Sequence, residues 1–436
     1  MSSRSVWLLK KGSERKFHFG HPWVFSSELA QSPKGIEAGQ LVELRDVKGT
    51  FLALGYGHPN SMISFRTLSL DKNENFDARF FCDRFSRARR VREVAGVARE
   101  SHRLIFAEGD FLPGLVIDRF LLDSTAPDSS AQVFVIQTST AGVDRLLPTI
   151  LEGLELFVRE TDTGASWERT AVVVANDSKS RAMEGLPAEP KKLVKDVAGF
   201  DPANARISIQ APIESMKPTA FDVDFVGGQK TGFFLDQRLN VQLAAREVVE
   251  LARTAKREGR PLRILDLFCY VGQWGAQLAH VAVREGAEVE VVLVDASAKA
   301  LELAAANVER VGGKAMPEKR DVVDELAKLE RGAFDVVVCD PPAFVKKKKD
   351  LPQGSQAYYK VNREAIRKTR KGGLFVSCSC SGLFDETEFR SMLSRVVASF
   401  DGRVRWIARG SHSVDHPQRP EFPQGTYLKS WLGLVD

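Results

Sequence analysis

Residues 263–275 read Arg-Ile-Leu-Asp-Leu-Phe-Cys-Tyr-Val-Gly-Gln-Trp-Gly, a strand-like run followed by a loop. Its first five residues form an apolar run typical of a buried strand, and Gly272 marks the loop that follows. Further strand-like runs lie at 288–294, 334–339 and 374–377, with helical periodicity over 297–310. Alternating strands and helices predict a parallel, doubly wound sheet, which we expect over residues 216–436.

The composition is that of a multidomain globular protein. A chain of 436 residues is too long for one core and fits two or three domains. The net charge of +5 is small for this length and is only a weak hint of an anionic partner. The start of the chain lacks the apolar core of a signal peptide, and no apolar run approaches membrane-spanning length.

The five cysteines indicate reduced thiols and no metal site. They lie at positions 82, 269, 339, 378 and 380, without metal-ligand spacing or a disulfide framework. Reduced thiols suit the cytoplasm, which is the location we expect.

The first half of the chain predicts two domains. Residues 1–74 read as short strands separated by turns, which favours a small barrel or sandwich. Residues 75–215 predict an α+β domain, with helices at 76–103 and 143–158 and strands at 115–118, 133–136 and 171–174. Loops are expected at 122–131 and 176–204.

The 76–103 helix carries arginines on the face opposite its apolar residues. They are either a solvated face, balanced by Asp83 and Glu93, or a phosphate-contacting face. The arginines are Arg79, Arg84, Arg87, Arg89, Arg90 and Arg92.

The loop after the 263–267 strand has the composition of a cofactor-binding loop. It lacks the G-x-G-x-x-G pattern, which disfavours a pyrophosphate-binding loop. The pattern Asp266-x-Phe268-x-x-x-Gly272 resembles instead the loop of class I S-adenosylmethionine enzymes. In such a loop Gly272 lets the backbone approach the methionine moiety, and Asp266 accepts a hydrogen bond from the ligand.

Two more carboxylates follow strands of the same sheet. Asp295 has the position to accept hydrogen bonds from ribose hydroxyls, and Asp321 has the position to accept one from an adenine amino group. The alternative for each is a helix N-cap or turn residue. Because ligands of doubly wound sheets bind at the carboxyl ends of the strands, the joint placement favours a cofactor site.

The third strand ends in Asp340-Pro341-Pro342-Ala343-Phe344. Two prolines make a rigid, extended loop and remove two N–H donors, so carbonyl groups and the Asp340 carboxylate face the cleft. Phe344 offers a face on which a base can stack. Loops of this type are common to methyltransferases of planar nitrogen heterocycles and do not identify the methylated atom.

A nearby cysteine distinguishes methylation of a ring carbon from methylation of an exocyclic amine. Residues 377–382 read Ser-Cys-Ser-Cys-Ser-Gly at the end of the next strand. Cytosine C5 becomes nucleophilic only after a thiolate adds to C6, whereas methylation of an exocyclic amine needs no thiol. Cys378 and Cys380 share one face of an extended strand, and Gly382 places Cys380 nearer the mouth. We interpret Cys378, Cys339 and Cys82 as small buried hydrophobic residues.

Several segments, in order and over nearly the whole chain, resemble the ribosomal large-subunit methyltransferase I family, which makes 5-methylcytosine in large-subunit ribosomal RNA. They are residues 21–25, 103–120, 230–238, 340–344, 379–382, 415–417 and 423–429. The resemblance implies an N-terminal PUA domain (a small RNA-binding barrel), a central α+β domain and a C-terminal Rossmann-like class I methyltransferase domain. Basic residues at 10, 11, 15 and 16 would then contact RNA backbone.

The resemblance also implies roles for individual residues. Cys380 would be the nucleophile, and Asp340 would hold the cytosine N3/N4 edge and assist proton movement. S-adenosylmethionine would contact Gln237, Asp266, Phe268, Tyr270, Gly272, Asp295, Asp321 and Asp340. The RNA base would lie against Pro341, Pro342, Phe344 and Lys230. The implied partner is large-subunit ribosomal RNA, without a membrane or a metal, and a homodimer is compatible with the sequence.

The sequence departs from the family pattern in three places. Ala343 stands where many relatives have lysine; residues 346–349, four lysines, either replace that contact or form a solvated loop. The extra Cys378 means that the nucleophile needs a test. Leu122 to Ser130 resembles an insertion. Two other functions stay open: a guanine or adenine N-methyltransferase on the same fold, and an RNA-binding assembly factor without catalysis.

Overall fold

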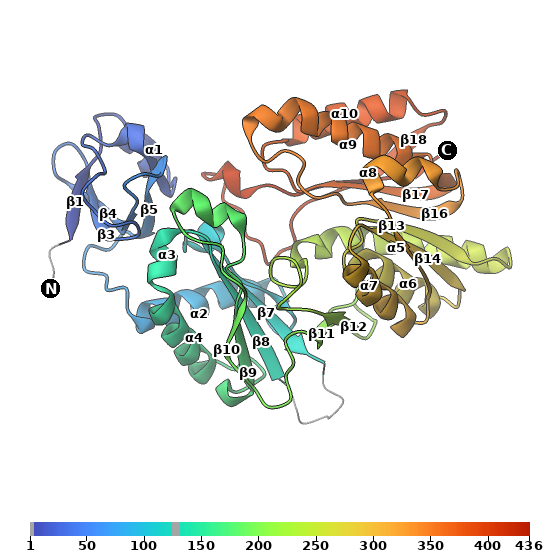
Figure 1. Cartoon of the computed structure of the whole chain (residues 1–436), viewed down its shortest axis with the longest axis horizontal. Coiled ribbons are helices and arrows are strands. Elements are labelled where there is room, and N and C mark those ends of the chain that lie inside the picture. Colours follow the sequence, from blue (N-terminus) through green and yellow to red (C-terminus); the bar gives the residue numbers. More distant parts are fainter. Residues whose placement is uncertain (1–3, 124–130) are drawn as a thin grey trace. The chain divides into compact units, whose positions relative to one another are not determined.

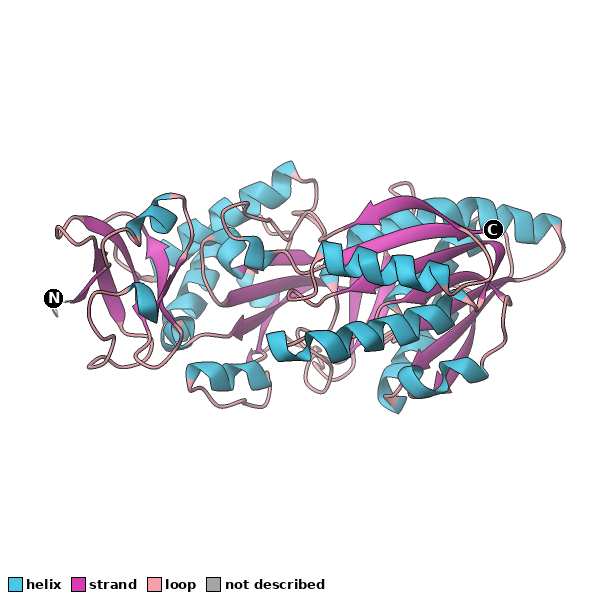
Figure 2. Ribbon diagram, turned by 90° about the horizontal axis from the view of Figure 1, so that it is seen from above, coloured by secondary structure: helices cyan, strands magenta, loops and turns pink. Residues whose placement is uncertain are grey.

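The computed structural model describes residues 4–123 and 131–436 (Figure 1). Most of the segment predicted as an insertion, residues 124–130, lies outside this description. The chain forms two compact units of mixed helix and strand (Figure 2). Met1–Ala205, Asp224–Gly232 and Val414–Gly425 form the first unit, and Arg206–Val223, Phe233–Ser413 and Thr426–Asp436 form the second. The three-domain division at residues 74 and 215 stays a prediction.

The first unit begins with a five-stranded sheet of order β1-β3-β4-β5-β2. Its strands are β1 (Ser5–Leu8), β2 (Trp23–Phe25), β3 (Leu41–Arg45), β4 (Phe51–Gly57) and β5 (Ile63–Ser69), with α1 (Glu14–His18) between the first two. An antiparallel bridge pairs Leu9, just after β1, with Leu29, beyond β2, so the two edges of the sheet approach each other. This arrangement, around a core that includes Trp7 and Phe65, agrees with the predicted small barrel.

A second sheet in this unit has the order β10-β9-β8-β7, and β6 also pairs with β7. Its strands are β6 (His102–Phe106), β7 (Leu115–Leu122), β8 (Ala131–Thr138), β9 (Thr170–Val174) and β10 (Lys192–Lys195). Helices α2 (Ala78–Val94), α3 (Ala141–Arg145) and α4 (Leu147–Glu160) accompany it. Gly153 of α4 permits close packing on α2, because a Cβ there would lie 2.6 Å from Cβ of Phe81.

Two predictions for this region were wrong in detail. The helix predicted over 76–103 ends at Val94, because the chain turns at Gly96, whose φ is 75°, and then enters the second sheet as β6. The segment 176–204, predicted as a loop, contains β10. The sequence of β10, Lys-Leu-Val-Lys, is short and its residues are exposed or half-buried, so it lacks the apolar signal of a core strand.

The second unit is built on a seven-stranded sheet of order β15-β14-β13-β16-β17-β19-β18. The strands β13 (Leu262–Leu267), β14 (Val289–Asp295), β15 (Lys314–Lys319), β16 (Phe334–Cys339) and β17 (Thr369–Ser379) are parallel. The last strands, β18 (Val404–Gly410) and β19 (Lys429–Val435), are antiparallel additions. In chain order this is 3-2-1-4-5-7-6, a doubly wound sheet, as the strand–helix alternation predicted.

Helices cover both faces of this sheet (Figure 1). On one face lie α5 (Arg238–Arg257), α6 (Gln273–Arg284) and α7 (Ala298–Arg310), and on the other lie α8 (Val322–Glu325), α9 (Leu351–Ile366) and α10 (Glu386–Ala398). The short strands β11 (Ala205–Ile209) and β12 (Thr219–Val223) precede them. Nowhere in the described residues is a helix both long and apolar enough to span a membrane.

Candidate active site

The strand registers bring three predicted aspartates to one edge of the second unit's sheet. Leu267 of β13 pairs with Val294 of β14 and with Cys339 of β16. Asp266 therefore lies at the end of the central strand, with Asp295 and Asp340 at the ends of its two neighbours. Because all three strands are parallel, their carboxyl ends meet at the edge where doubly wound sheets bind ligands.

The loop between β13 and α6 has a strained backbone. Phe268 and Tyr270 have left-handed φ angles of 61° and 49°, and Gly272 has a φ of 74°. Such a conformation costs a non-glycine residue about 1–3 kcal/mol and is found mostly at ligand sites. The amide of Tyr270 donates to Asp295 Oδ2 at 3.0 Å, which helps to hold the loop. A Cβ on Gly272 would lie 3.0 Å from Cβ of Ala304, so this turn has little room for a side chain.

Asp266 is a fully buried carboxyl group with one satisfied oxygen. Its Oδ2 accepts from the Gly275 amide at 2.8 Å, while its buried Oδ1 has no hydrogen-bond partner among the described residues. Burial raises the pKa of Asp266 to about 8, and the charges of Asp340 and Asp295 add to this effect. A buried acceptor without a donor is costly, so this site fits a ligand that brings N–H or O–H groups.

Asp321 is a helix N-cap, whereas Asp295 is not. Asp295 accepts from the amides of Tyr270 and Ser297, but Ser297 itself caps α7, with its Oγ accepting from the Ala300 amide. Asp321 is exposed and is the N-cap of α8, accepting from Val323 at 2.9 Å. The N-cap alternative therefore applies to Asp321, whose adenine contact stays a prediction.

Asp340 is oriented by hydrogen bonds from two other elements. Its Oδ2 accepts from Gln237 Nε2 at 2.8 Å and from Trp274 Nε1 at 3.2 Å. Gln237 is held in turn, because its Oε1 accepts from Asn240 Nδ2 at 2.6 Å. Trp274 is a site residue that the sequence reasoning missed, although it lies two positions after Gly272 in the cofactor loop. These contacts direct one edge of the Asp340 carboxylate before any ligand binds.

The loop after Asp340 lies beside the end of β17. The Cys380 thiol donates to the carbonyl of Pro341, with 3.8 Å between sulfur and oxygen. Pro342 is exposed, and the half-buried Phe344 packs edge-on against Tyr358 at 4.8 Å between ring centroids. The predicted carboxylate, proline loop and cysteine thus come together at the ends of two adjacent strands.

The two cysteines of the Ser-Cys-Ser-Cys-Ser-Gly segment have different environments. Cys378 lies inside β17, is fully buried and donates to Ser430 Oγ at 3.4 Å; burial raises the pKa of its thiol well above the usual value. Cys380 follows the last residue of β17 and is half-buried. Every cysteine of the chain lies in the described part, and only Cys380 is not buried.

A buried lysine stabilises the turn that follows Cys380. Lys429 Nζ donates to the carbonyls of Ser381 and Phe384, each at 2.6 Å, and of Tyr427 at 2.9 Å. Burial lowers the pKa of Lys429 to about 8, against the opposing effect of a nearby Cys380 charge. The sequence reasoning did not single out Lys429, although it ends the 423–429 segment that resembles the family.

Tyr358 contacts the same turn. Its hydroxyl group lies 2.9 Å from Ser381 Oγ, and Ser381 Oγ also accepts from the Val345 amide. Burial, with Cys380 as a further cause, raises the pKa of Tyr358 to about 12, so this hydroxyl stays protonated. The turn after Cys380 is therefore tied to α9 as well as to β19.

Lys230, predicted to contact substrate, belongs to the first unit. It lines a cavity of about 290 Å³ with Thr138, Asn176 and Arg181. Its backbone is left-handed, with a φ of 47°. Its proposed contact with the RNA base stays a prediction.

Comparisons with known proteins agree with this architecture. Residues 8–70 match the PUA-like domain family, and residues 259–408 match the methyltransferase domain family. The protein SMU.776, solved as a complex with SAH and assigned to the methyltransferases, superposes with a TM-score of 0.73 at 17% identity, covering 99% of this chain and 100% of its own. An S-adenosylmethionine-dependent methyltransferase fold from Streptococcus mutans gives a TM-score of 0.71 at 16% identity, with the same coverage.

The residues present fit S-adenosylmethionine. This cofactor carries ammonium and hydroxyl donors, which the unpartnered Asp266 Oδ1 and the carboxylate of Asp295 can accept. The strained loop around Phe268 and Tyr270 is the segment that would approach the methionine moiety. The chain is thus an S-adenosylmethionine-dependent methyltransferase, as predicted.

Relatives match this chain over nearly its entire length, and two of them serve as examples. Ribosomal RNA large subunit methyltransferase I of Photobacterium profundum is 33% identical over 441 residues, which cover 99% of each chain. The protein of the same name from an Enterobacter species is 31% identical over 443 residues, which cover 100% of each. With this identity over nearly its whole length, and with its PUA-like and methyltransferase domains, the chain belongs to the ribosomal RNA large subunit methyltransferase I family.

Proposed function

We propose that this protein methylates C5 of a cytosine in large-subunit ribosomal RNA, with Cys380 as the nucleophile. The observation that carries the proposal is the meeting of one half-buried thiol, Cys380, with the carboxylate-bearing Asp340 loop at adjacent strand ends. A base held in the Asp340 loop would thus lie next to a nucleophile, an arrangement that amine methylation does not require. The RNA target follows from the names of the full-length relatives.

The reaction begins at the Cys380 sulfur. The thiol gives up its proton and the thiolate adds to cytosine C6, which breaks the C5–C6 double bond and makes C5 an enamine carbon. S-adenosylmethionine supplies a methyl group on a positively charged sulfonium, and C5 takes that methyl group. A base then removes the C5 proton, the C6–S bond breaks, and Cys380 is released as the aromatic ring is restored.

The surrounding residues support these steps in distinct ways. Asp340, oriented by Gln237 and Trp274, would accept from the cytosine N4 amino group and assist proton movement at the N3/N4 edge. The Lys429 ammonium favours the thiolate form of Cys380 and orders the turn that carries it. Phe344 would pack against the base. Together these groups would bind and orient the cytosine.

The test uses Cys380→Ala with Cys378→Ala as the matched control. Ribosomal RNA from cells lacking the protein is methylated in vitro, and the product nucleosides are identified by mass spectrometry. Cys380→Ala should form no 5-methylcytidine while binding S-adenosylmethionine normally in calorimetry, and Cys378→Ala should remain active. RNA containing 5-fluorocytidine should trap a covalent complex with the wild type and with Cys378→Ala only.

Two results would contradict the proposal. Full activity of Cys380→Ala would contradict the assignment of Cys380 as nucleophile, and methylated guanine or adenine nitrogens in the product would indicate an N-methyltransferase instead.

We also propose a cytoplasmic location, since none of the five cysteines forms a disulfide.

A further inference from the structure

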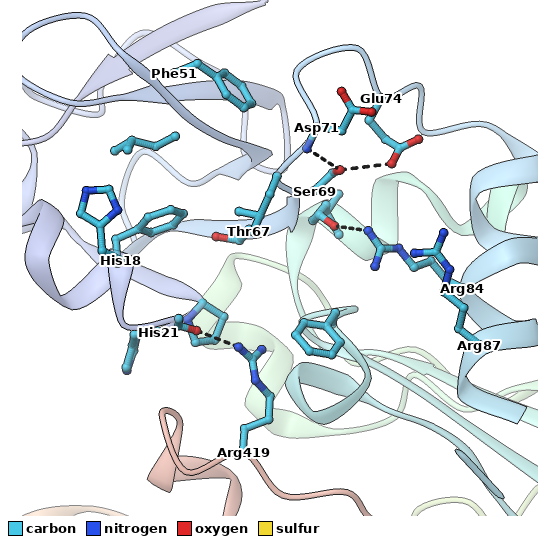
Figure 3. A pocket seen from close by; sticks show the side chains of 17 residues that line it. His18, His21, Phe51, Thr67, Ser69, Asp71, Glu74, Arg84, Arg87 and Arg419 are labelled. Carbon is cyan, nitrogen blue, oxygen red and sulfur yellow. Dashed lines mark hydrogen bonds between the residues drawn. The ribbon is translucent and has the colours of Figure 1, made fainter. Parts of the chain in front are cut away.

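The first unit contains a cavity of about 760 Å³ that none of the residue roles above explains. Its walls come from the β1–β5 sheet and the loops around it, from α2 and from the segment Val414–Gly425 (Figure 3). The volume falls within the range of about 300–1,000 Å³ that is typical of sites for small ligands. Figure 3 shows Arg84 and Arg87 on one side, His18 and Phe51 on the other, and Arg419 below.

Two arginines of α2 give the cavity an anion-binding side. Arg84 and Arg87 are three residues apart and therefore lie on the same face of the helix. Arg84 Nη2 donates to the Leu68 carbonyl at 3.1 Å, which holds its guanidinium in place. Burial lowers the pKa of Arg84, and the neighbouring Arg87 charge acts in the same direction. In the described chain, neither guanidinium has a carboxylate within ion-pair distance, although Glu74 lies close enough to attract Arg84.

A second side of the cavity is a platform for flat rings. The Phe111 side chain is 52% exposed, and the Arg419 guanidinium carbon lies 4.3 Å from its ring centroid. Arg419 is anchored by donating to the carbonyls of Gly20, at 2.7 Å, and Glu108, at 3.1 Å. Leu70, another lining residue, is 69% exposed. The Arg419 side chain is only 10% exposed and also pairs with the Glu421 carboxylate at 2.7 Å, so it supports the ring. The exposed Phe111 ring is the surface on which a nucleobase can stack.

The remaining polar groups of the cavity suit a ligand that both donates and accepts hydrogen bonds. Thr67 Oγ1 is buried and lacks a hydrogen-bond partner among the described residues. The carboxylates of Asp71 and Glu74 also line the cavity, where they can accept from N–H groups. A simple anion would be repelled by these carboxylates. A nucleotide has a phosphate for the arginines, a flat base for the ring platform and base N–H groups for the carboxylates.

We propose that this cavity binds an unpaired nucleotide of the RNA substrate, with its phosphate at Arg84 and Arg87 and its base against Phe111. This inference rests on the proposed function, which makes the substrate an RNA. An acidic protein segment would satisfy the two arginines but has no need of the ring platform. The cavity therefore acts as a second RNA-binding site, which selects RNA with an accessible single-stranded nucleotide.

The experiment measures RNA binding by full-length variants. Arg87→Ala removes an exposed phosphate contact, and Phe111→Leu removes the exposed ring. Arg90→Ala is the matched control, because Arg90 lies on the same helix, is not part of the cavity lining and has a side chain that is 75% exposed. Fluorescence anisotropy with a labelled large-subunit ribosomal RNA fragment gives the dissociation constant between 50 and 200 mM salt. Thermal unfolding and S-adenosylmethionine calorimetry check that each variant is folded.

The expected results separate the two contacts. Arg87→Ala should weaken RNA binding about three- to tenfold and make the log–log salt slope shallower by about 0.7, the value for one single-strand phosphate. Phe111→Leu should weaken binding at least about fivefold with an unchanged slope, since stacking does not release counterions. Arg90→Ala should stay within about twofold of the wild type, as expected for an exposed charge outside the cavity.

The outcomes also distinguish this inference from the proposed function. If Arg87→Ala and Phe111→Leu bind RNA as tightly as Arg90→Ala, the cavity is not an RNA site, and an acidic protein partner becomes the better explanation. That result would leave methylation by the wild type untouched. A wild type that neither binds nor methylates ribosomal RNA would instead contradict the proposed function.

Discussion

Replacing Asp266 by asparagine should separate the stability of the apoprotein from its affinity for the cofactor. The buried carboxyl group has a pKa of about 8 in the folded chain, against 3.8 in the unfolded chain. Asparagine is nearly the same size, and its Oδ1 can still accept from the Gly275 amide. The variant therefore removes the ionisation of residue 266 and retains its hydrogen bond to the loop.

The sign of the effect follows from where the proton is bound. Between pH 3.8 and pH 8 the folded state keeps a proton on Asp266 that the unfolded state has released, so stability is complete at low pH and falls as pH rises through this window. Each pH unit is worth about 1.36 kcal/mol. From pH 5 to pH 8, the unfolding free energy of Asp266→Asn should rise relative to that of the wild type by up to about 4 kcal/mol.

The assay is urea unfolding of the cofactor-free protein at pH 5, 6, 7 and 8. Asp321→Asn is the control, because Asp321 is an exposed N-cap and asparagine caps equally well. S-adenosylmethionine affinity should fall about tenfold or more in Asp266→Asn, because the asparagine Nδ2 group takes the place of the aspartate Oδ1 and cannot accept a hydrogen bond. A stability difference between Asp266→Asn and the wild type that does not change with pH would show that the raised pKa of Asp266 does not affect folding.

Two further predictions concern buried cations. Lys429→Met should reduce the unfolding free energy by about 2–5 kcal/mol and methylation by at least tenfold, because three carbonyls lose their donor. Its S-adenosylmethionine affinity should stay within about threefold of the wild type. Unimpaired turnover of the variant would contradict this role of Lys429. Arg92→Met should cost about 3–5 kcal/mol, because it leaves the buried Asp110 carboxylate without its guanidinium. Thermal unfolding measures this loss, and the exposed Arg90→Met should change stability by less than about 0.5 kcal/mol.

Local sequence patterns predicted the sheet of the methyltransferase unit closely. The runs at 263–267, 288–294 and 334–339 correspond to β13, β14 and β16 within one residue at each end. These strands are mostly buried, so their sequences are rich in apolar residues, and an aspartate lies at or next to the carboxyl end of each. The strand at 374–377 is longer than predicted, because β17 starts at Thr369 with polar residues that carry no strand signal.

Contacts between distant segments were harder to predict. Trp274 donates to Asp340, 66 positions away, and Lys429 donates to Ser381, 48 positions away. Neither contact follows from a local pattern, because a tryptophan in an apolar helix and a lysine at the start of a strand are common in any protein. The helix predicted to run to residue 103 likewise ended at Val94, where the turn at Gly96 outweighed the continuing periodicity.

Sequence patterns were enough to predict the doubly wound sheet, the family and the three strand ends that carry Asp266, Asp295 and Asp340. Hydrophobic periodicity and apolar runs are local properties of the sequence. A parallel sheet brings the carboxyl ends of its strands together at one edge, independently of the rest of the chain. The sequence also predicted that Cys378 is buried and that Cys380 lies nearer the mouth, but the contacts that cause this difference came only from the tertiary structure. Cys378 donates to Ser430 of β19 and Cys380 donates to Pro341 of the Asp340 loop, and both partners are distant in the sequence.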